Sequence, residues 1–418
     1  MTGRALAFVS LVVLVPLAAT GQAPAPAAPP LTLERAVDRF LARNLAVEAA
    51  RYRVDAARAD RLTAGLRPNP TLTLSTENLK LSGPTPVSEL YEVTSSLSYP
   101  IERGDKRRLR IEAADAAISL AETHFADTMR LRLTELKRAF YEILVARATR
   151  DHALETRQAL DTLVDFNRVR LEEGAVAEGE LLKVRLERGK HEAGLAQAEL
   201  ALRQAGIRLL DLLGESDFST AGEVTGALDV VATVPELATL RAAALSERPS
   251  LRAAQHTVTL AARRVAVERS RATVDVSPFV GLRRAGENNT VLFGISIPLP
   301  IHDRNQGAIA RAIAEEQTAV AELALHRNRV LAEVELAWHA WQTARRQAAA
   351  FERELLRQAE ESHAIALAAY REGAQGLVEY LEAQRTLTDM RHDHARSLFE
   401  AHAALLRLEQ AVGRDVGR

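Results

Sequence analysis

Residues 297–307 read IPLPIHDRNQG, and residues 97–108 read LSYPIERGDKRR. Each stretch follows a short segment in which apolar and polar residues alternate, and each precedes a long segment of helical pattern. Other features recur with nearly the same spacing: Glu135 corresponds to Glu335, and Gly174 corresponds to Gly373. A duplication this regular indicates one supersecondary unit that is built twice.

The duplication predicts two structural repeats, 32–225 and 226–418, each consisting of a helix, two strands and a long helical hairpin. Before them, residues 1–21 are predicted to be a secretory signal and residues 22–31 a Pro/Ala-rich spacer. Arg4 supplies the positive charge, residues 5–19 are apolar, and small residues precede Gln22. The apolar run is shorter than the roughly 20 residues that span a bilayer, although a membrane anchor is the alternative interpretation.

The composition of the 418 residues favours long helices, because aromatic residues make up only 4% and Ala, Leu, Arg and Glu dominate. The net charge of −1 gives no indication of a nucleic-acid partner. The sequence contains no cysteine, which excludes disulfides, thiolate metal sites, cysteine nucleophiles and a lipidated N-terminal cysteine.

Helical pattern dominates both repeats. Residues of one apolar stripe recur three or four positions apart: Phe125, Met129, Leu133, Leu136, Phe140 and Leu144. The predicted helices cover 33–66 with an interruption near Asn44, the run from Asp105 to Gly174, 178–213, a segment ending near Arg271 and broken at Arg248–Pro249, 306–373, and 377–412. The two runs of nearly 70 residues predict unbroken helices, each roughly 100 Å long. Residues 214–234 are less regular and link the halves.

Four segments alternate with period two and are predicted strands: 71–79, 91–99, 279–283 and 291–297, with a loop at 82–86 and a turn at 286–289. A lipid-facing sheet cannot leave its edges unpaired, so four strands per chain must be pooled. Two chains give a filled eight-stranded barrel, whereas three give twelve strands and a lumen. Taken singly, the alternating segments have soluble hairpins as their alternative interpretation, and the long helical segments have ordinary coiled coils.

This order of elements resembles the TolC-like outer-membrane efflux family, and the wording of residues 298–307 is most similar to its cobalt-zinc-cadmium branch. The resemblance implies a mainly α homotrimer with a twelve-stranded β-barrel in outer-membrane lipid and an α-helical tunnel in the periplasm. It further implies a passive exit channel for heavy-metal cations that works with a periplasmic adaptor and an inner-membrane resistance-nodulation-division pump. Export of drugs or secreted proteins is the alternative substrate class. A periplasmic coiled-coil adaptor or structural protein is the alternative of a different class.

The resemblance also assigns roles at the two hairpin turns. Glu379 and Glu382 fall where the family narrows its pore, and their i, i+3 spacing places them on one helix face. The alternative is that both glutamates only stabilise the start of a helix through its dipole. The residues expected to contact the adaptor are Gly174, Glu180, Leu181, Gly373, Leu377 and Leu381.

No pattern in the sequence predicts a metal centre, a cofactor or an enzyme. His392 and His394 are two residues apart and point to different faces of a helix. Glu360 with His363, and Glu335 with His339, lack a third ligand. The three methionines are dispersed, and neither a phosphate-binding glycine loop nor a convincing Ser/His/Asp order is present.

Overall fold

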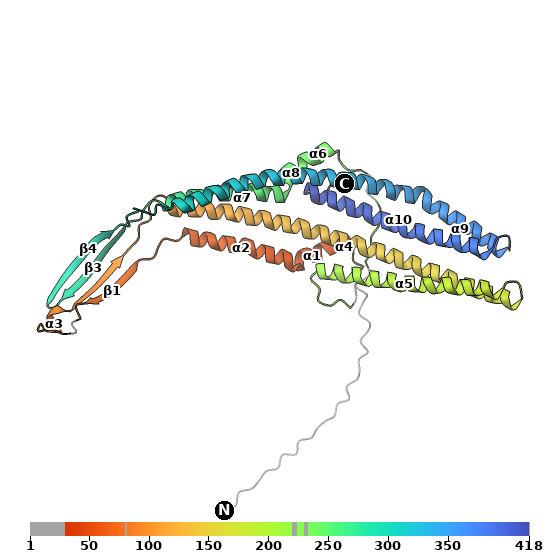
Figure 1. Cartoon of the computed structure of the whole chain (residues 1–418), viewed down its shortest axis with the longest axis horizontal. Helices are drawn as coiled ribbons and strands as arrows, with labels where there is room; N and C mark the ends of the chain where they lie inside the picture. The colour runs from red at the N-terminus through yellow and green to blue at the C-terminus, as the bar shows by residue number, and fades with distance from the viewer. Residues whose placement is uncertain (1–29, 80–81, 220–223, 230–232, 418) are drawn as a thin grey trace, which may run out of the picture.

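The computed structural model describes residues 30–79, 82–219, 224–229 and 233–417. The predicted signal at 1–21 and nearly all of the spacer lie outside these residues. Long helices run along an elongated body that carries the strands at one end and the connecting turns of two helical hairpins at the other (Figure 1). Leu31 is a correction to the spacer boundary, because it is buried and forms a bridge with Val224.

The same order of elements occurs twice, with small additions in each copy. The first copy contains α1 (Leu33–Arg43), α2 (Leu45–Gly65), β1 (Thr71–Glu77), α3 (Val87–Leu90), β2 (Glu92–Ser98), α4 (Lys106–Glu172) and α5 (Glu178–Leu212). The second contains α6 (Leu237–Glu247), α7 (Pro249–Arg271), β3 (Ser277–Ala285), β4 (Asn288–Ser296), α8 (Gln306–Ala350), the π-helical segment η1 (Phe351–Leu355), α9 (Leu356–Arg371) and α10 (Leu377–Val412).

The two predicted helix breaks are confirmed and have local causes. Asn44 ends α1 and caps α2, since its side-chain oxygen accepts a hydrogen bond from the Val47 N–H at 3.1 Å. Its amide also donates to the Leu212 carbonyl at 2.8 Å, which ties the break to the end of α5. At the second break Pro249 occupies the first position of α7, where its missing N–H costs nothing.

Two predicted elements need correction, and one short helix was not predicted. The helix expected without a break over 306–373 contains η1, so a π-helical turn separates α8 from α9. A short helix, α3, follows the predicted loop at 82–86. The turn between β3 and β4 is tighter than predicted, because Asn288 and Asn289 already pair with Ala285 and Arg284.

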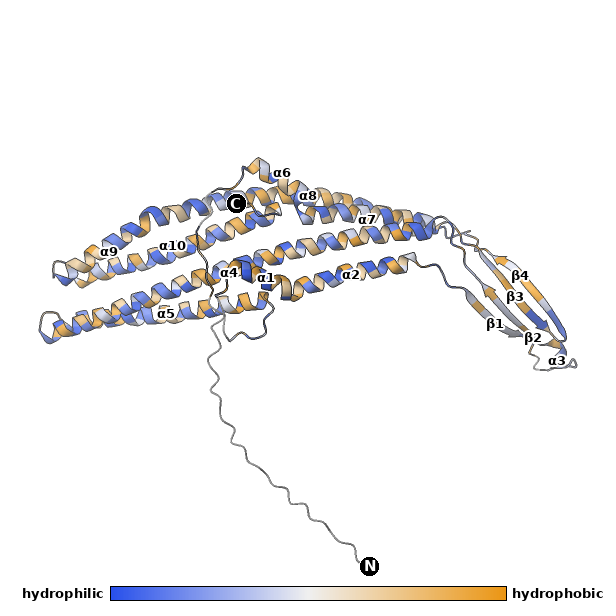
Figure 2. Cartoon of the chain, turned by 180° about the vertical axis from the view of Figure 1, so that it is seen from behind, coloured by the Kyte–Doolittle hydropathy of each residue, from blue (hydrophilic) through white to orange (hydrophobic). Residues whose placement is uncertain are grey.

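In the half of the body nearest the strands, α2, α4, α7 and α8 pack side by side in that order. In the other half α5 packs on α4, α9 packs on α10, and α10 also packs on α4 (Figure 1). Hydrophobic and hydrophilic residues are interspersed along the ribbons of all the long helices (Figure 2). The 67-residue α4 runs through both halves, and helices of both halves pack against it.

Each repeat has its own core midway along the body, and a third core lies near the helical turns. The apolar stripe predicted on α4 is confirmed, because all six of its residues belong to the first core or pack against it. The second core gathers around Trp341 and Leu408 of α8 and α10. The third core joins the two hairpins through residues of four helices: Leu160, Leu163, Val184, Ala366, Tyr370, Leu377 and Tyr380.

The first core generates a stability prediction. Phe140 is 2% exposed, so Phe140→Ala removes a buried ring and leaves a cavity beside α1 and α5. We expect the free energy of unfolding to fall by about 3–5 kcal/mol, measured by denaturant titration of the purified protein. Phe218→Ala is the matched control, since Phe218 is 43% exposed and should change stability by less than about 0.5 kcal/mol. Equal losses in both variants would contradict the assigned core.

Candidate functional site

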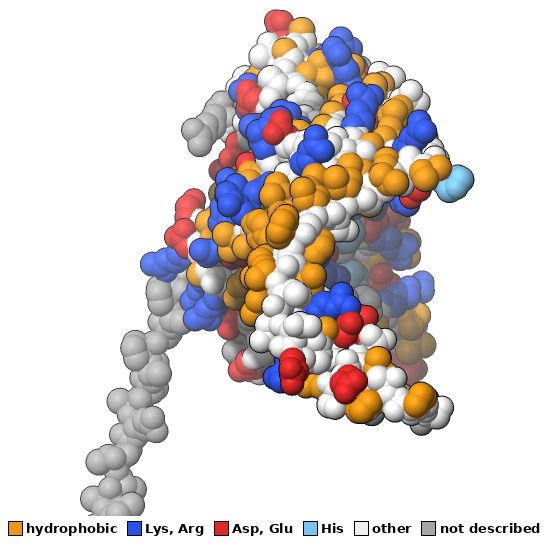
Figure 3. Space-filling view, turned by 90° about the vertical axis from the view of Figure 1, so that its left-hand side faces the viewer, with side chains coloured by type: hydrophobic (Ala, Val, Ile, Leu, Met, Phe, Trp, Pro, Cys, Tyr) orange, Lys and Arg blue, Asp and Glu red, His pale blue; other side chains and the backbone are white. Residues whose placement is uncertain are grey.

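The strands form one antiparallel sheet in the order β1-β2-β3-β4, and its register separates apolar from polar residues. Leu72 pairs with Leu97, Leu97 with Val280, and Val280 with Phe293, so these four side chains share one face. Phe293 is 86% exposed. Exposed apolar residues cover most of this face: Leu72, Leu74, Val93, Leu97, Val280, Leu282, Val291, Phe293 and Ile295. Seen from the sheet end, hydrophobic side chains form a band over the strands (Figure 3).

The opposite face of the sheet is mainly polar. Thr71, Thr73 and Ser75 of β1 lie opposite Ser98, Ser96 and Thr94 of β2. Arg283 of β3 forms an ion pair with Glu92 on this face. In the described part of the chain, β1 and β4 each have a strand on one side only. The sheet therefore has one apolar face, one polar face and two edges whose backbone groups lack a strand partner.

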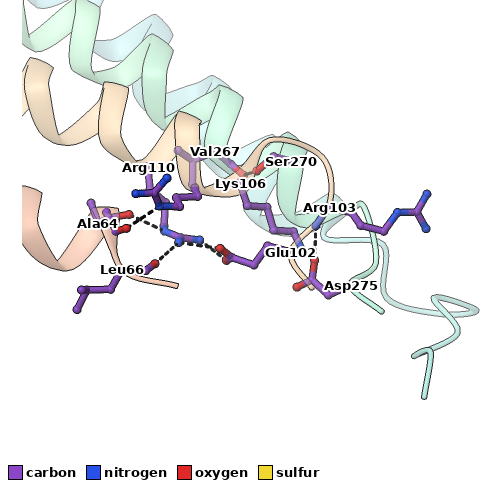
Figure 4. A network of polar contacts seen from close by, with 11 residues as sticks. Ala64, Leu66, Glu102, Arg103, Lys106, Arg110, Val267, Ser270 and Asp275 are labelled. Carbon is purple, nitrogen blue, oxygen red and sulfur yellow. Dashed lines mark hydrogen bonds and ion pairs between the residues drawn. The ribbon is translucent and has the colours of Figure 1, made fainter. Parts of the chain in front are cut away.

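The segment 99–105 leads from β2 into α4 and is called here the first strand exit. Arg110 of α4 joins this segment to the end of α2. Its guanidinium pairs with both carboxylate oxygens of Glu102 and donates to the backbone carbonyls of Ala64 and Leu66 at 3.3 and 3.1 Å (Figure 4). The fixed planar geometry of a guanidinium suits this bidentate contact. Arg107 adds a hydrogen bond to the Gly65 carbonyl at 2.6 Å.

Lys106 joins the same region to the segment before β3. Its Nζ donates to Asp275 Oδ1 at 2.7 Å, and this oxygen also accepts the Arg103 N–H at 3.0 Å (Figure 4). Lys106 and Arg107, two of the three consecutive basic residues at 106–108, thus fix the junction between sheet and helices. The third, Arg108, pairs with Asp105 and Glu112 along its own helix.

The second strand exit uses different residues for the same turn. Asn305 precedes α8 with φ of +62°, and Asp105 precedes α4 with φ of +57°. Asparagine and aspartate tolerate this left-handed conformation better than most residues. The Asn305 amide donates to the backbone and side-chain oxygens of Glu268 at 2.7 and 3.0 Å, which holds the exit against α7.

Gly174 and Gly373 form equivalent turns at the far end, with φ of +74° and +76°. The N–H of the next residue closes each turn at 2.8 Å: Ala175 donates to the Arg170 carbonyl, and Ala374 to the Ala369 carbonyl. A Cβ on either glycine would meet no atom within 4 Å. Backbone conformation rather than space therefore requires glycine here.

The leucines predicted near these turns have different environments. Leu181 and Leu377 are only 5% and 3% exposed, and Leu377 lies in the core between the hairpins. Leu381 also packs against this core, and Glu180 is partly buried. This burial leaves Leu181 and Leu377 little surface for a partner, whereas Leu182 and Val378 are exposed.

Glu379 and Glu382 are both exposed on the first turns of α10, but their surroundings differ. Gly376 caps α10, and a Cβ on it would lie 2.8 Å from Glu379 Oε2. Glu379 is thus folded back over the helix start, where a carboxylate is favoured by the unpaired N–H groups. Glu382 has no ion-pair partner among the described residues, so its charge is free to act on solvent ions.

Sequence reasoning missed the polar contact between the hairpins. The Tyr370 hydroxyl of α9 donates to Asn167 Oδ1 of α4 at 2.6 Å, and both residues are buried. The Tyr370 ring stacks on Tyr380 at 5.6 Å. Burial raises the pKa of the Tyr370 hydroxyl, with the Asn167 hydrogen bond acting in the opposite direction. The contact joins residues 203 positions apart, which no local pattern could reveal.

Possible metal ligands are dispersed over the described residues. Nowhere in these parts of the chain do three His, Asp or Glu side chains come together in a way that could hold a metal ion. His392 is exposed, whereas His394 is partly buried against other helices. The described helices include none that is both long and apolar enough to cross a membrane.

Comparison with known proteins agrees with this architecture. Residues 36–215 and 240–414 match the family described as outer membrane efflux protein. The chain is 28% identical to the cobalt-zinc-cadmium resistance protein CzcC of Cupriavidus metallidurans, over 99% of this chain and 98% of that protein. It is 31% identical to the nickel and cobalt resistance protein CnrC of the same organism, over 78% of this chain and 75% of that protein.

Among solved structures, the outer membrane protein VceC of Vibrio cholerae superposes with a TM-score of 0.75 and 20% identity, over 91% of this chain and 96% of VceC. The predicted mainly helical fold and the predicted family are both confirmed. The match of the family to both repeats, together with this fold, shows that the chain belongs to the outer membrane efflux protein family.

Proposed function

We propose that three copies of this outer-membrane efflux protein form a passive exit channel for heavy-metal cations. A periplasmic adaptor and an inner-membrane resistance-nodulation-division pump would deliver the cations to it. The observation that carries the proposal is the sheet, with one exposed apolar face, one polar face and two open edges. An apolar face suits lipid, and a polar face suits an aqueous lumen.

The open edges support association of several copies. In lipid, each unpaired backbone N–H or C=O costs several kcal/mol, so β1 of one copy must pair with β4 of the next. Two copies would give an eight-stranded barrel that its own side chains fill, whereas three give twelve strands and leave a lumen. Exposed apolar residues on the two flanks of the helical body offer surface for the same contact: Tyr52, Leu62, Leu186 and Leu200 on α2 and α5, and Val320, Leu325, Leu336 and Ile365 on α8 and α9.

The substrate class rests on the relatives and on the charge at the turns. CzcC and CnrC are named for resistance to cobalt, zinc, cadmium and nickel. Three copies of Glu382 would place three carboxylates near the end of the tunnel, and rings of carboxylates favour cations. The Tyr370–Asn167 hydrogen bond and the core between the hairpins would hold this end narrow.

Metal tolerance tests the proposed function. Deletion of the coding sequence from its host should lower the concentrations of cobalt, zinc or cadmium that stop growth, and the parent sequence should restore them. Hydrophobic drugs serve as the control, since a metal channel should leave drug tolerance unchanged. Loss of drug tolerance with normal metal tolerance would instead assign the channel to drug export.

The acidic residues generate a prediction about selectivity. Glu382→Gln should lower the cation-over-anion permeability ratio in planar bilayers at about 0.1 M salt, because it removes one charge per copy from the lumen. The difference should shrink at about 1 M salt, where the Debye length falls from roughly 10 to 3 Å. Glu379→Gln should have a smaller effect, since that carboxylate is folded onto the helix start. An unchanged ratio for Glu382→Gln at low salt would remove Glu382 from the narrow passage.

The turns generate a prediction about the adaptor. Gly373→Val forces a β-branched residue into φ of +76°, so the turn should distort and binding of the adaptor should weaken at least about tenfold. Gly373→Asn is the matched control, because asparagine tolerates this conformation and should bind nearly as the parent does. Affinity can be measured by surface plasmon resonance with immobilised channel. Normal affinity in the valine variant would place the adaptor contact elsewhere.

A further inference from the structure

The contact between α4 and α10 is the seam along which the two hairpins meet, and the two helices run in opposite directions there (Figure 1). Near the turns Arg391 pairs with Glu155 at 3.3 Å. Near the middle of the body the ring of His402 stacks on Tyr141 at 4.1 Å. These polar and aromatic contacts add to the apolar third core, which joins the same hairpins near the turns.

Histidines with unpartnered nitrogen atoms gather along this seam. Within the described residues, a buried ring nitrogen lacks a hydrogen-bond partner in four histidines: Nδ1 of His152 and Nε2 of His363, His394 and His402. His152 lies on α4, His394 and His402 on α10, and His363 on α9 beside Tyr380. A buried neutral imidazole can leave one nitrogen unpaired at modest cost, whereas a protonated one brings a charge that needs partners.

The charges around His394 are distributed unequally between the hairpins. The pKa of His394 is lowered, mainly by burial. The carboxylates of Glu352 in η1 and Glu360 in α9 act to raise this pKa, whereas His152 of α4 acts to lower it. Both carboxylates belong to the second hairpin, whereas the facing hairpin presents another histidine. On α4, Glu155 is already engaged by Arg391 at 3.3 Å and lies 3.6 Å from His152 Nδ1. A proton on His394 is thus attracted within its own hairpin and repelled across the seam.

Burial is also the main influence on two further histidines, His402 of α10 and His363 of α9. Burial lowers the pKa of His402, and the Leu228 backbone and Asp229 raise it. Burial also lowers the pKa of His363, with Gln384 raising it and Arg391 lowering it further. A lowered pKa in the closed seam means that the separated form binds more protons. The closed form therefore loses stability as pH falls below about 6.5, the ordinary value for histidine.

The π-helical segment η1 lies where the second hairpin can bend. It carries Glu352, which acts on His394, and it separates α8 from α9. A π-helical turn interrupts the regular backbone ladder, and such turns occur often at functional sites. The facing α4 has no such segment over its 67 residues.

We propose that the α4–α10 seam is a proton-sensitive clasp, in which protonation of His394 and His402 loosens the second hairpin from the first. The second hairpin then bends at η1, while α4 and the junction with the sheet keep their structure. This device goes beyond the proposed export function and would act on whatever the channel carries.

Amide hydrogen exchange of the purified full-length mature protein at pH 7.5 and 5.5 tests the clasp, with rates corrected for chemical exchange at each pH. In the parent, peptides covering 385–405 should be several-fold less protected at pH 5.5, because the separated form binds more protons there than the closed form. Peptides covering 306–320 near the sheet should show no change. His394→Gln should remove most of the pH effect, because glutamine does not titrate.

His392→Gln is the matched control, since His392 lies on the same helix with its side chain exposed, and it should retain the parent's pH effect. His402→Phe keeps the aromatic contact with Tyr141 and carries the test if His394→Gln does not fold. Equal protection of the parent at both pH values would overturn the proposal. So would a full pH effect in both seam variants, or its loss in His392→Gln. The measurement needs no metal, pump or adaptor, so it can fail while the metal-tolerance test succeeds.

Discussion

Open sheet edges are the constraint on which the rest of this structure depends. The four strands satisfy their hydrogen bonds internally, but β1 and β4 each expose one row of backbone groups. In water such edges are tolerable, whereas in hydrocarbon they must be paired. The exposed apolar face directs the sheet toward lipid, so the requirement for pairing and the choice of environment come from the same strands. In the proposed channel, several copies must therefore associate before the sheet can lie in lipid.

The junction between sheet and helices transmits that arrangement to the rest of the body. Arg110 and Lys106 bring together the end of α2, the start of α4 and the segment before β3. Asn305 holds the start of α8 against α7. The strand exits are therefore fixed by charged and amide side chains whose geometry is specific, and not by apolar packing alone. The segments 97–108 and 297–307 thus join a strand to a long helix with different residues.

Local patterns sufficed to predict most of the fold. The bounds of α10 agree with prediction at Leu377 and Val412, because a glycine turn and a glycine cap mark its two ends. The π-helical segment escaped prediction, because one extra residue only shifts the phase of the apolar pattern, and the small residues Ala348–Ala350 before it present no sharp stripe in which the shift could be seen. The burial of Leu377 also escaped, because the core around it is formed by hairpins from different repeats. The backward fold of Glu379 is a local effect, and its position three residues after Gly376 was a usable signal.

Among the described residues, the π-helical segment η1 makes the long helices of the two repeats unequal in continuity. In the first repeat, α4 runs as one unbroken rod from the strand exit to the turn at Gly174. In the second, the corresponding rod is divided between α8 and α9 at Phe351–Leu355. In a closed ring of such chains, continuous helices would alternate around the circumference with helices that contain a π-helical turn. If the second hairpin bends at η1 as proposed, such a ring would widen at the end away from the strands while the sheet and its junction keep their structure.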